Sequence, residues 1–309
     1  MKIFKFFTFA VLSFSLSISC ASAQTNRKKK VKTIIKTPAA TQSPRKIRER
    51  KPPEFDTETG GAANVKTIAE GSDASVTTPF VFVARTADAF AQLQKLVKNL
   101  PLEKTDFNQT AIVAVFAGEK NTGGYSLAVE KSGDTISVKV AAPPKDAMVT
   151  QSLTMPFKVV LVEVAQENSL AIDLSSDFSS AMKNYRVSSG AFEFSGGITG
   201  RLKTFAADGT IKILTFGDYV TAIFNLTGKA GENRRTLNEI ASGTLINGKI
   251  NLTRVEAGDF IDRPHPFLTV AGSFSSDKLS LSFSPGKRDY VVNDGYAGGG
   301  KLVAVVSGW

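Results

Sequence analysis

The chain has very few of the side chains that usually carry metal or nucleophilic chemistry. Its 309 residues include one cysteine, one histidine and one tryptophan. The cysteine is Cys20, so signal cleavage after Ala23 would leave a mature chain without a thiol, a disulfide or a thiolate metal ligand. Because histidine clusters and an H-E-x-x-H motif are also absent from the sequence, we expect no metal site and no cofactor.

The single histidine, His265, lies between Pro264 and Pro266. A serine hydrolase requires an imidazole that a carboxylate orients, and Asp259 and Asp262 are near His265 only in sequence. A structural or solvent-facing histidine is therefore the favoured interpretation, and a hydrolase that uses His265 is the less favoured one. The other carboxylates form no calcium-binding loop, and the glycine-rich segments lack the Lys-Ser or Lys-Thr pair of a phosphate-binding loop. We predict no catalytic residues and no enzymatic activity.

Residues 1–23 predict a secretory signal peptide. Lysines near the start precede the apolar run 6–18, and an Ala-Ser-Ala sequence that ends at Ala23 has the form of a cleavage site. The alternative is lipidation at Cys20, but Ser17 stands where a lipoprotein signal has an aliphatic residue. We therefore expect an exported protein, periplasmic, secreted or at the cell surface, with cleavage after Ala23 favoured over lipidation.

Positive charge is concentrated in residues 24–64. The segment from Arg27 to Lys51 contains eleven basic residues and one acidic residue, and its net charge of +10 equals that of the whole chain. Because the segment is proline-rich and has too few apolar residues to form a core, we predict a disordered linker. A solvated spacer is the favoured interpretation of the charge. Binding to an anionic envelope polymer or lipid is the alternative, and nucleic acid is disfavoured as a partner.

Residues 65–165 predict an α+β domain that is mainly β with one helix. Val81 to Val83 indicate a strand, and Thr86 is placed to cap an amphipathic helix over residues 87–100. Further strands are predicted at the apolar or alternating runs 112–117, 125–129, 136–140 and 157–164. The two alternating runs are separated by a turn sequence, so they predict a hairpin.

Residues 166–189 have weak periodicity and predict a linker with a short helix. Residues 190–309 predict an all-β antiparallel domain, a barrel or a sandwich, since they contain only strand and turn patterns. Asn247-Gly248 is a strong signal for a two-residue hairpin turn. The last strand, 301–306, is expected to pair inward and close the sheet.

Two short groups of residues between Asp106 and Val164 combine glycine or proline with polar side chains. The first is Thr122-Gly123-Gly124-Tyr125, and the second is Pro143-Pro144 followed by Thr150-Gln151. Adjacent glycines allow positive φ or close approach of the backbone, and consecutive prolines stiffen an exposed loop, which lowers the entropic cost of binding a partner. The simpler interpretation, which we favour, is that these residues only shape the ends of hairpins. The candidate binding residues are Thr122, Gly123, Gly124, Tyr125, Pro143, Pro144, Thr150 and Gln151.

The order and spacing of these groups resemble the C-terminal domain of the PrcB-like family of protease-complex subunits, over about residues 65–165. The resemblance is carried by the two groups and by Asp106-Phe107, Gly118, Val149 and Pro156-Phe157. It implies a bacterial exported protein and a non-catalytic subunit that associates with a surface protease or helps it mature. One departure is the sequence Lys145-Asp146-Ala147 after Pro144, where the resemblance leads us to expect a glycine.

Together these observations predict an exported, non-catalytic binding or scaffolding protein with a protein partner, which the resemblance identifies as a protease or another envelope protein. The first alternative is a structural protein held to the envelope by its basic tail. The second is the hydrolase that would use His265.

Overall fold

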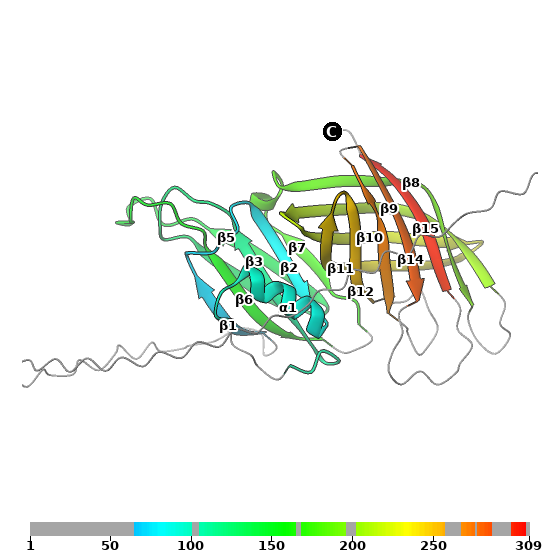
Figure 1. The fold of residues 1–309 in the computed structure, drawn as a ribbon, viewed down its shortest axis with the longest axis horizontal. Helices are drawn as coiled ribbons and strands as arrows, with labels where there is room; N and C mark the ends of the chain where they lie inside the picture. The colour runs from blue at the N-terminus through cyan, green and yellow to red at the C-terminus, as the bar shows by residue number, and fades with distance from the viewer. Residues whose placement is uncertain are drawn as a thin grey trace, which may run out of the picture. The chain divides into compact units, whose positions relative to one another are not determined.

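The computed structural model describes residues 65–100, 105–164, 168–195, 202–256, 267–275, 277–285 and 298–306. All of them lie in one compact unit, Glu58–Trp309. Their secondary structure consists of fifteen strands, one α-helix and one short 3-10 helix (Figure 1). The prediction of a mainly β chain with one helix in its first part is therefore confirmed.

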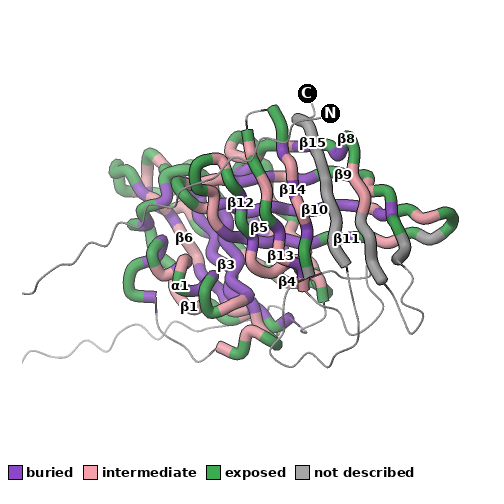
Figure 2. Tube along the Cα trace, turned by 45° about the vertical axis from the view of Figure 1, so that its right-hand side comes forward, coloured by how far each residue is buried: buried purple, intermediate pink, exposed green. Residues whose placement is uncertain are grey.

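The first part of the unit contains an antiparallel sheet with the strand order β1-β6-β3-β2. Its strands are β1 (Val65–Gly71), β2 (Pro79–Ala84), β3 (Thr110–Ala117) and β6 (Phe157–Glu163). Residues 111–117 of β3 are all buried, as their continuously apolar sequence predicted (Figure 2). An apolar sequence of this kind suits a strand that is covered on both faces.

Helix α1 (Ala87–Leu96) connects β2 to β3 and begins at the predicted cap (Figure 1). The Thr86 hydroxyl accepts a hydrogen bond from the Ala89 backbone N–H at 3.1 Å. The apolar face of α1 is buried in the same core as the sheet. The helix ends before the predicted Leu100, because the backbone becomes extended at its C-cap and Asn99 has a φ of +59°.

A second, smaller sheet has the order β4-β5-β7. The predicted hairpin is present as β4 (Ser126–Ser132) and β5 (Thr135–Ala141), and β7 (Ala171–Leu174) pairs parallel to β5. Strand β7 and the 3-10 helix Ser176–Phe178 lie in segment 166–189, which was expected to be a linker with a short helix. The described part of this segment carries regular structure because Leu170 and Phe178 are fully buried in the core.

The second part of the unit is a closed antiparallel barrel in which strands that are consecutive in sequence are paired, from β8 to β15, and β15 pairs with β8. The prediction that the last strand closes the sheet is therefore confirmed, and so is the hairpin at Asn247-Gly248, where both residues have positive φ. The strand bounds are β8 (Met182–Ser195), β9 (Leu202–Phe216), β10 (Tyr219–Ala230), β11 (Asn233–Ile246), β12 (Lys249–Val255), β13 (Leu268–Phe274), β14 (Lys278–Pro285) and β15 (Gly298–Val306).

Apolar side chains from the barrel strands form their own core, with Phe224, Leu252 and Val270 among the fully buried members. Strands β10 and β11 also contribute Ile223 and Ile240 to the core of the first part. The alternation of side chains along a strand explains this division, since successive residues face opposite sides of the sheet.

The barrel also covers the free edge of β2, which pairs only with β3 among the described strands. The Val83 backbone N–H donates to the Ser242 hydroxyl at 2.8 Å, and the Thr221 hydroxyl donates to the Val81 carbonyl at 2.5 Å. Ser242 and Thr221 are 2.6 Å apart, and Ser242 must be the donor because Thr221 has given its proton to Val81. An edge that would otherwise be open to another strand is thus satisfied by two buried hydroxyl groups.

Among the described residues, no helix is long and apolar enough to cross a bilayer.

Candidate functional site

The candidate binding residues lie in two loops that join the four-stranded sheet to the smaller one. We call them the β3–β4 loop (residues 118–125) and the β5–β6 loop (residues 142–156). At one sheet, Phe116 of β3 lies opposite Phe157 of β6, and at the other, Ser126 of β4 lies opposite Ala141 of β5. Since the loops start and end at paired positions, their ends lie side by side at both sheets.

Backbone hydrogen bonds hold the two loops together. Lys120 and Thr154 exchange backbone hydrogen bonds of 2.8 and 2.9 Å. Farther along, the Gly123 N–H donates to the Thr150 carbonyl at 3.0 Å, and the Thr154 hydroxyl donates to the Thr122 carbonyl at 2.8 Å. The loops therefore behave as one structural unit, which we call the paired loops.

The two glycines are required by this close contact. A Cβ atom at Gly123 would collide with the Thr150 hydroxyl. Gly124 has a φ of +83°, and a Cβ there would lie 2.9 Å from Val149 Cγ1 and 3.0 Å from Pro143 Cβ. The structure thus brings the Thr-Gly-Gly group against the Pro143 and Val149-Thr150 group, although about twenty residues separate them in the sequence.

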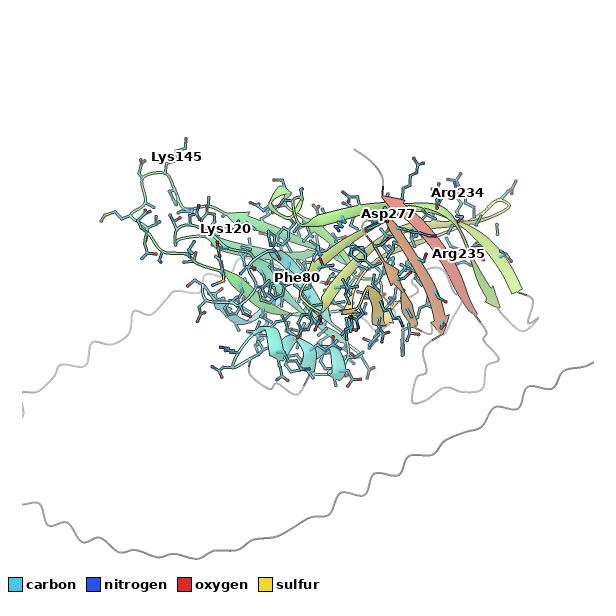
Figure 3. All side chains as sticks on the ribbon, turned by 45° about the horizontal axis from the view of Figure 1, so that its top comes forward. Phe80, Lys120, Lys145, Arg234, Arg235 and Asp277 are labelled. Atoms are coloured by element: carbon cyan, nitrogen blue, oxygen red, sulfur yellow. The ribbon has the colours of Figure 1, made fainter. Side chains whose placement is uncertain are left out.

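The remaining candidate residues lie around this contact. The Lys120 ammonium is 5.3 Å from the centre of the half-buried Tyr125 ring, which is a cation–π distance. The Pro144 carbonyl accepts a hydrogen bond from Ala147 N–H at 3.0 Å and so closes a turn. Gln151 is exposed. In Figure 3, Lys145 lies at the outer tip of the β5–β6 loop, whereas Lys120 lies closer to the sheet.

Two apolar side chains of the β5–β6 loop were not predicted as site residues. Met148 is 102% exposed and Leu153 is 62% exposed. The other large apolar side chain with high exposure among the described residues is Ile246, in the barrel. The signal that could have found them is their position, since both are apolar residues within a segment bounded by prolines that has no strand or helix periodicity.

A second constellation, which we call the Arg–Glu cluster, is buried between β2 and the barrel. It consists of Arg85, Glu239, Arg254 and Glu256. Arg85 Nη1 is 3.0 Å from Glu239 Oε1, and Arg254 Nε is 2.6 Å from Glu256 Oε1. Arg85 Nη2 also donates to the Asn168 carbonyl, and Arg254 Nη1 donates to the backbone carbonyls of Arg85 and Phe107. The cluster could not be predicted from the sequence, because Arg85 is 154 positions away from Glu239.

The surroundings of Glu239 shift the pKa of its carboxyl in opposite directions. Complete burial raises the pKa of the Glu239 carboxyl, and this effect outweighs the Arg85 charge and the hydrogen bond from Leu170 N–H, which lower it. The resulting pKa is about 8. The cavity beside the cluster has a volume of about 10 Å³, lined in part by Arg85 and Arg254, which is room for about one water molecule. The cluster joins the two parts of the unit through the hydrogen bond between Arg85 and Glu239.

Other predicted features lie outside the described residues. They are His265 with its neighbours Asp259 and Asp262, the signal segment and the basic segment from Arg27 to Lys51. Among the described residues, no group of three or more His, Cys, Asp or Glu side chains is arranged to hold a metal ion.

Comparisons with known proteins give one relationship. A search of curated proteins and a search of solved structures both found no match. A family model does match residues 111–163, which run from β3 to the end of β6 and contain both of the paired loops. The matched segment is shorter than the 65–165 expected from the motifs, but it includes all the candidate binding residues. The family is described as PrcB C-terminal, and the match confirms the resemblance that the two sequence groups carry.

Proposed function

We propose that this protein is an exported, non-catalytic binding subunit that associates with a protease complex through the paired loops. The family of the matched segment is one of protease-complex subunits. The observation that carries the proposal is that the matched residues 111–163 form a single unit in which the two loops are locked to each other and present their outer side chains to solvent. A fixed loop loses little conformational entropy when it binds, which favours association with a folded partner.

The rest of the molecule supports a scaffolding role. The barrel core is filled by side chains from its own strands, and the outer surface of β10 and β11 covers the edge of β2. The Arg–Glu cluster adds a buried hydrogen bond from Arg85 to Glu239 to the same contact. These contacts support the sheet that carries the paired loops, and they leave the loops themselves uncovered.

Purification of the full chain from the producing cells, after chemical crosslinking, tests the proposal. We expect a protease to be recovered with the wild-type chain. The Gly124→Asn variant should recover much less of it, because an Asn side chain at φ +83° would displace Val149 and Pro143.

The matched control is Gly231→Asn, in the turn between β10 and β11. Gly231 also has a positive φ, +61°, but a Cβ there meets nothing within 4 Å. Asn is one of the residues that tolerates this backbone region, so Gly231→Asn should recover the protease as the wild-type chain does. Recovery of no protein partner by the wild-type chain would reject the proposed function.

A further inference from the structure

The β5–β6 loop carries the most exposed large apolar side chain among the described residues. Met148 is 102% exposed, so its side chain has no more cover than it would have in an extended peptide. Removal of an apolar side chain of this size from water lowers the free energy of the system. Isolated exposed apolar residues are common, so exposure alone identifies nothing, and the support of the loop decides its meaning.

The backbone on the C-terminal side of Met148 is fixed. Thr150 is bonded to Gly123 at 3.0 Å, and Val149 Cγ1 packs on Gly124 so closely that a Cβ atom there would lie 2.9 Å away. On its N-terminal side, the turn from Pro144 to Ala147 begins at the second of two consecutive prolines. Met148 is therefore held outward between two anchored points, and its presentation to a partner requires little further ordering.

The charges near Met148 indicate what kind of partner fits it. Lys145 and Asp146 are both exposed and have opposite signs, so the tip of the loop has no net charge. A loop that binds an anionic membrane surface usually combines basic residues with aromatic ones. Neutral, mixed-sign surroundings of an apolar side chain are typical of a protein interface, where an apolar centre is surrounded by a polar rim.

We propose that Met148 is the anchor of the interface with the protease complex and inserts into an apolar pocket on the protease, with Leu153 at the edge of the contact. This inference rests on the proposed function and adds to it the residue and the chemistry of the partner's surface. A flexible, unbranched thioether suits this role because it adapts its shape to a pocket.

The test measures binding of the protease recovered with the wild-type chain to purified full-length variants. Met148→Ala should weaken binding by about 30-fold or more, as expected for a central anchor, and Met148→Leu should stay within a few-fold of wild type. Ile246→Ala is the matched control, because Ile246 is a 52% exposed apolar side chain in the barrel, in the strand end before the Asn247-Gly248 turn. Circular dichroism of each variant checks that the fold is retained.

A second measurement does not depend on a loss of binding. A photoreactive benzophenone side chain placed at position 148 should crosslink to the protease at residues that line an apolar pocket, and the same group at position 246 should not. Equal binding by wild type and Met148→Ala, or no crosslink from position 148, would overturn the anchor and leave the proposed function standing.

Binding of Met148 to two other partners, a lipid surface and a second copy of this chain, is tested in parallel. Met148-dependent binding to phosphatidylethanolamine–phosphatidylglycerol vesicles would assign the anchor to a lipid surface, and Met148-dependent dimerisation in sedimentation experiments would assign it to a second copy of this chain. Either result overturns the inference. If the wild-type chain recovers no protein at all, the proposed function and the anchor fail together.

Discussion

At the scale of single residues, Glu239 is a buried carboxyl whose protonation should control stability. Its pKa of about 8 in the folded protein, set mainly by burial, is above the ordinary value of 4.5. The folded state therefore binds more protons than the unfolded state between these two pH values. The stabilisation from this group is complete below pH 4.5 and is lost as the pH rises through 8.

We predict that the free energy of unfolding falls between pH 5 and pH 8 in the wild-type protein, and that Glu239→Gln removes most of this fall. Glutamine resembles the protonated carboxyl, since it is neutral and its oxygen can still accept the hydrogen bond from Leu170 N–H. Urea unfolding of both proteins across this pH range gives the comparison. Parallel pH profiles for the two proteins would show that Glu239 does not titrate in this interval.

The exposure of Met148 makes a separate chemical prediction. Methionine oxidation follows access to solvent, and Met148 is fully exposed, whereas Met155 and Met182 are partly buried. Mild treatment with hydrogen peroxide should therefore convert Met148 to the sulfoxide before Met155 or Met182, as peptide mass measurements would show. Because the sulfoxide is polar, the oxidised protein should also bind the protease less well, and Met148→Leu should resist this loss. Earlier oxidation of Met155 would contradict the exposed position of Met148.

At the scale of elements, the edge of β2 depends on two hydroxyl groups that come from the barrel. Ser242→Ala removes the acceptor of the buried Val83 N–H, and an unsatisfied buried donor costs about 1–3 kcal/mol. We expect the free energy of unfolding to fall by about that amount. The control is Ser189→Ala on the exposed surface of β8, which should change stability by less than about 0.5 kcal/mol.

The Ser242 and Thr221 substitutions should not be additive, because the two hydroxyls share one chain of hydrogen bonds. A double-mutant cycle with Ser242→Ala and Thr221→Val measures the coupling. Strict additivity would show that the two hydroxyls satisfy the β2 edge independently.

The elements also show which parts of the fold were accessible from the sequence. The start of α1 at Thr86 and the turn at Asn247-Gly248 were predicted correctly because each depends on the preference of one or two residues for a particular backbone conformation. Strand β7 was missed, since a strand of four residues has too few positions to show an alternation. Its place is decided by pairing with β5, and the burial of Leu170 beside it depends on the barrel strand β11.

The candidate site also has features that could be predicted from the sequence and features that could not. Gly123 and Gly124 could be selected because glycine has few roles other than positive φ and close contact. The pairing of the loops was not predicted, since it follows from the register of β3 with β6 and of β4 with β5. The Arg–Glu cluster was beyond reach, because Arg85 and Glu239 are 154 positions apart and charged residues are frequent throughout the chain.

At the scale of the whole molecule, the sheet and the barrel share so many buried contacts that they should unfold together. Leu214, Ile223 and Ile240 of the barrel strands belong to the same core as the first sheet. The β2 edge and the Arg–Glu cluster would both lose buried hydrogen-bond partners if either part unfolded alone, and each buried polar group left unsatisfied costs about 1–3 kcal/mol. We predict a single calorimetric transition whose van't Hoff and calorimetric enthalpies agree.

A destabilised variant distinguishes cooperative unfolding of the whole unit from independent unfolding of the sheet and the barrel at the same midpoint temperature. Leu252→Ala removes a fully buried side chain from the barrel core only and should destabilise the barrel by about 2–5 kcal/mol. If the unit is cooperative, the loss of structure around the first sheet shifts to lower temperature by the same amount as that of the barrel. Hydrogen exchange at Val113 and Val160, in β3 and β6, follows the first sheet, and exchange at Phe224 follows the barrel. Faster exchange in the barrel with unchanged exchange in β3 and β6 would show that the two parts unfold separately and that their shared contacts contribute little to stability.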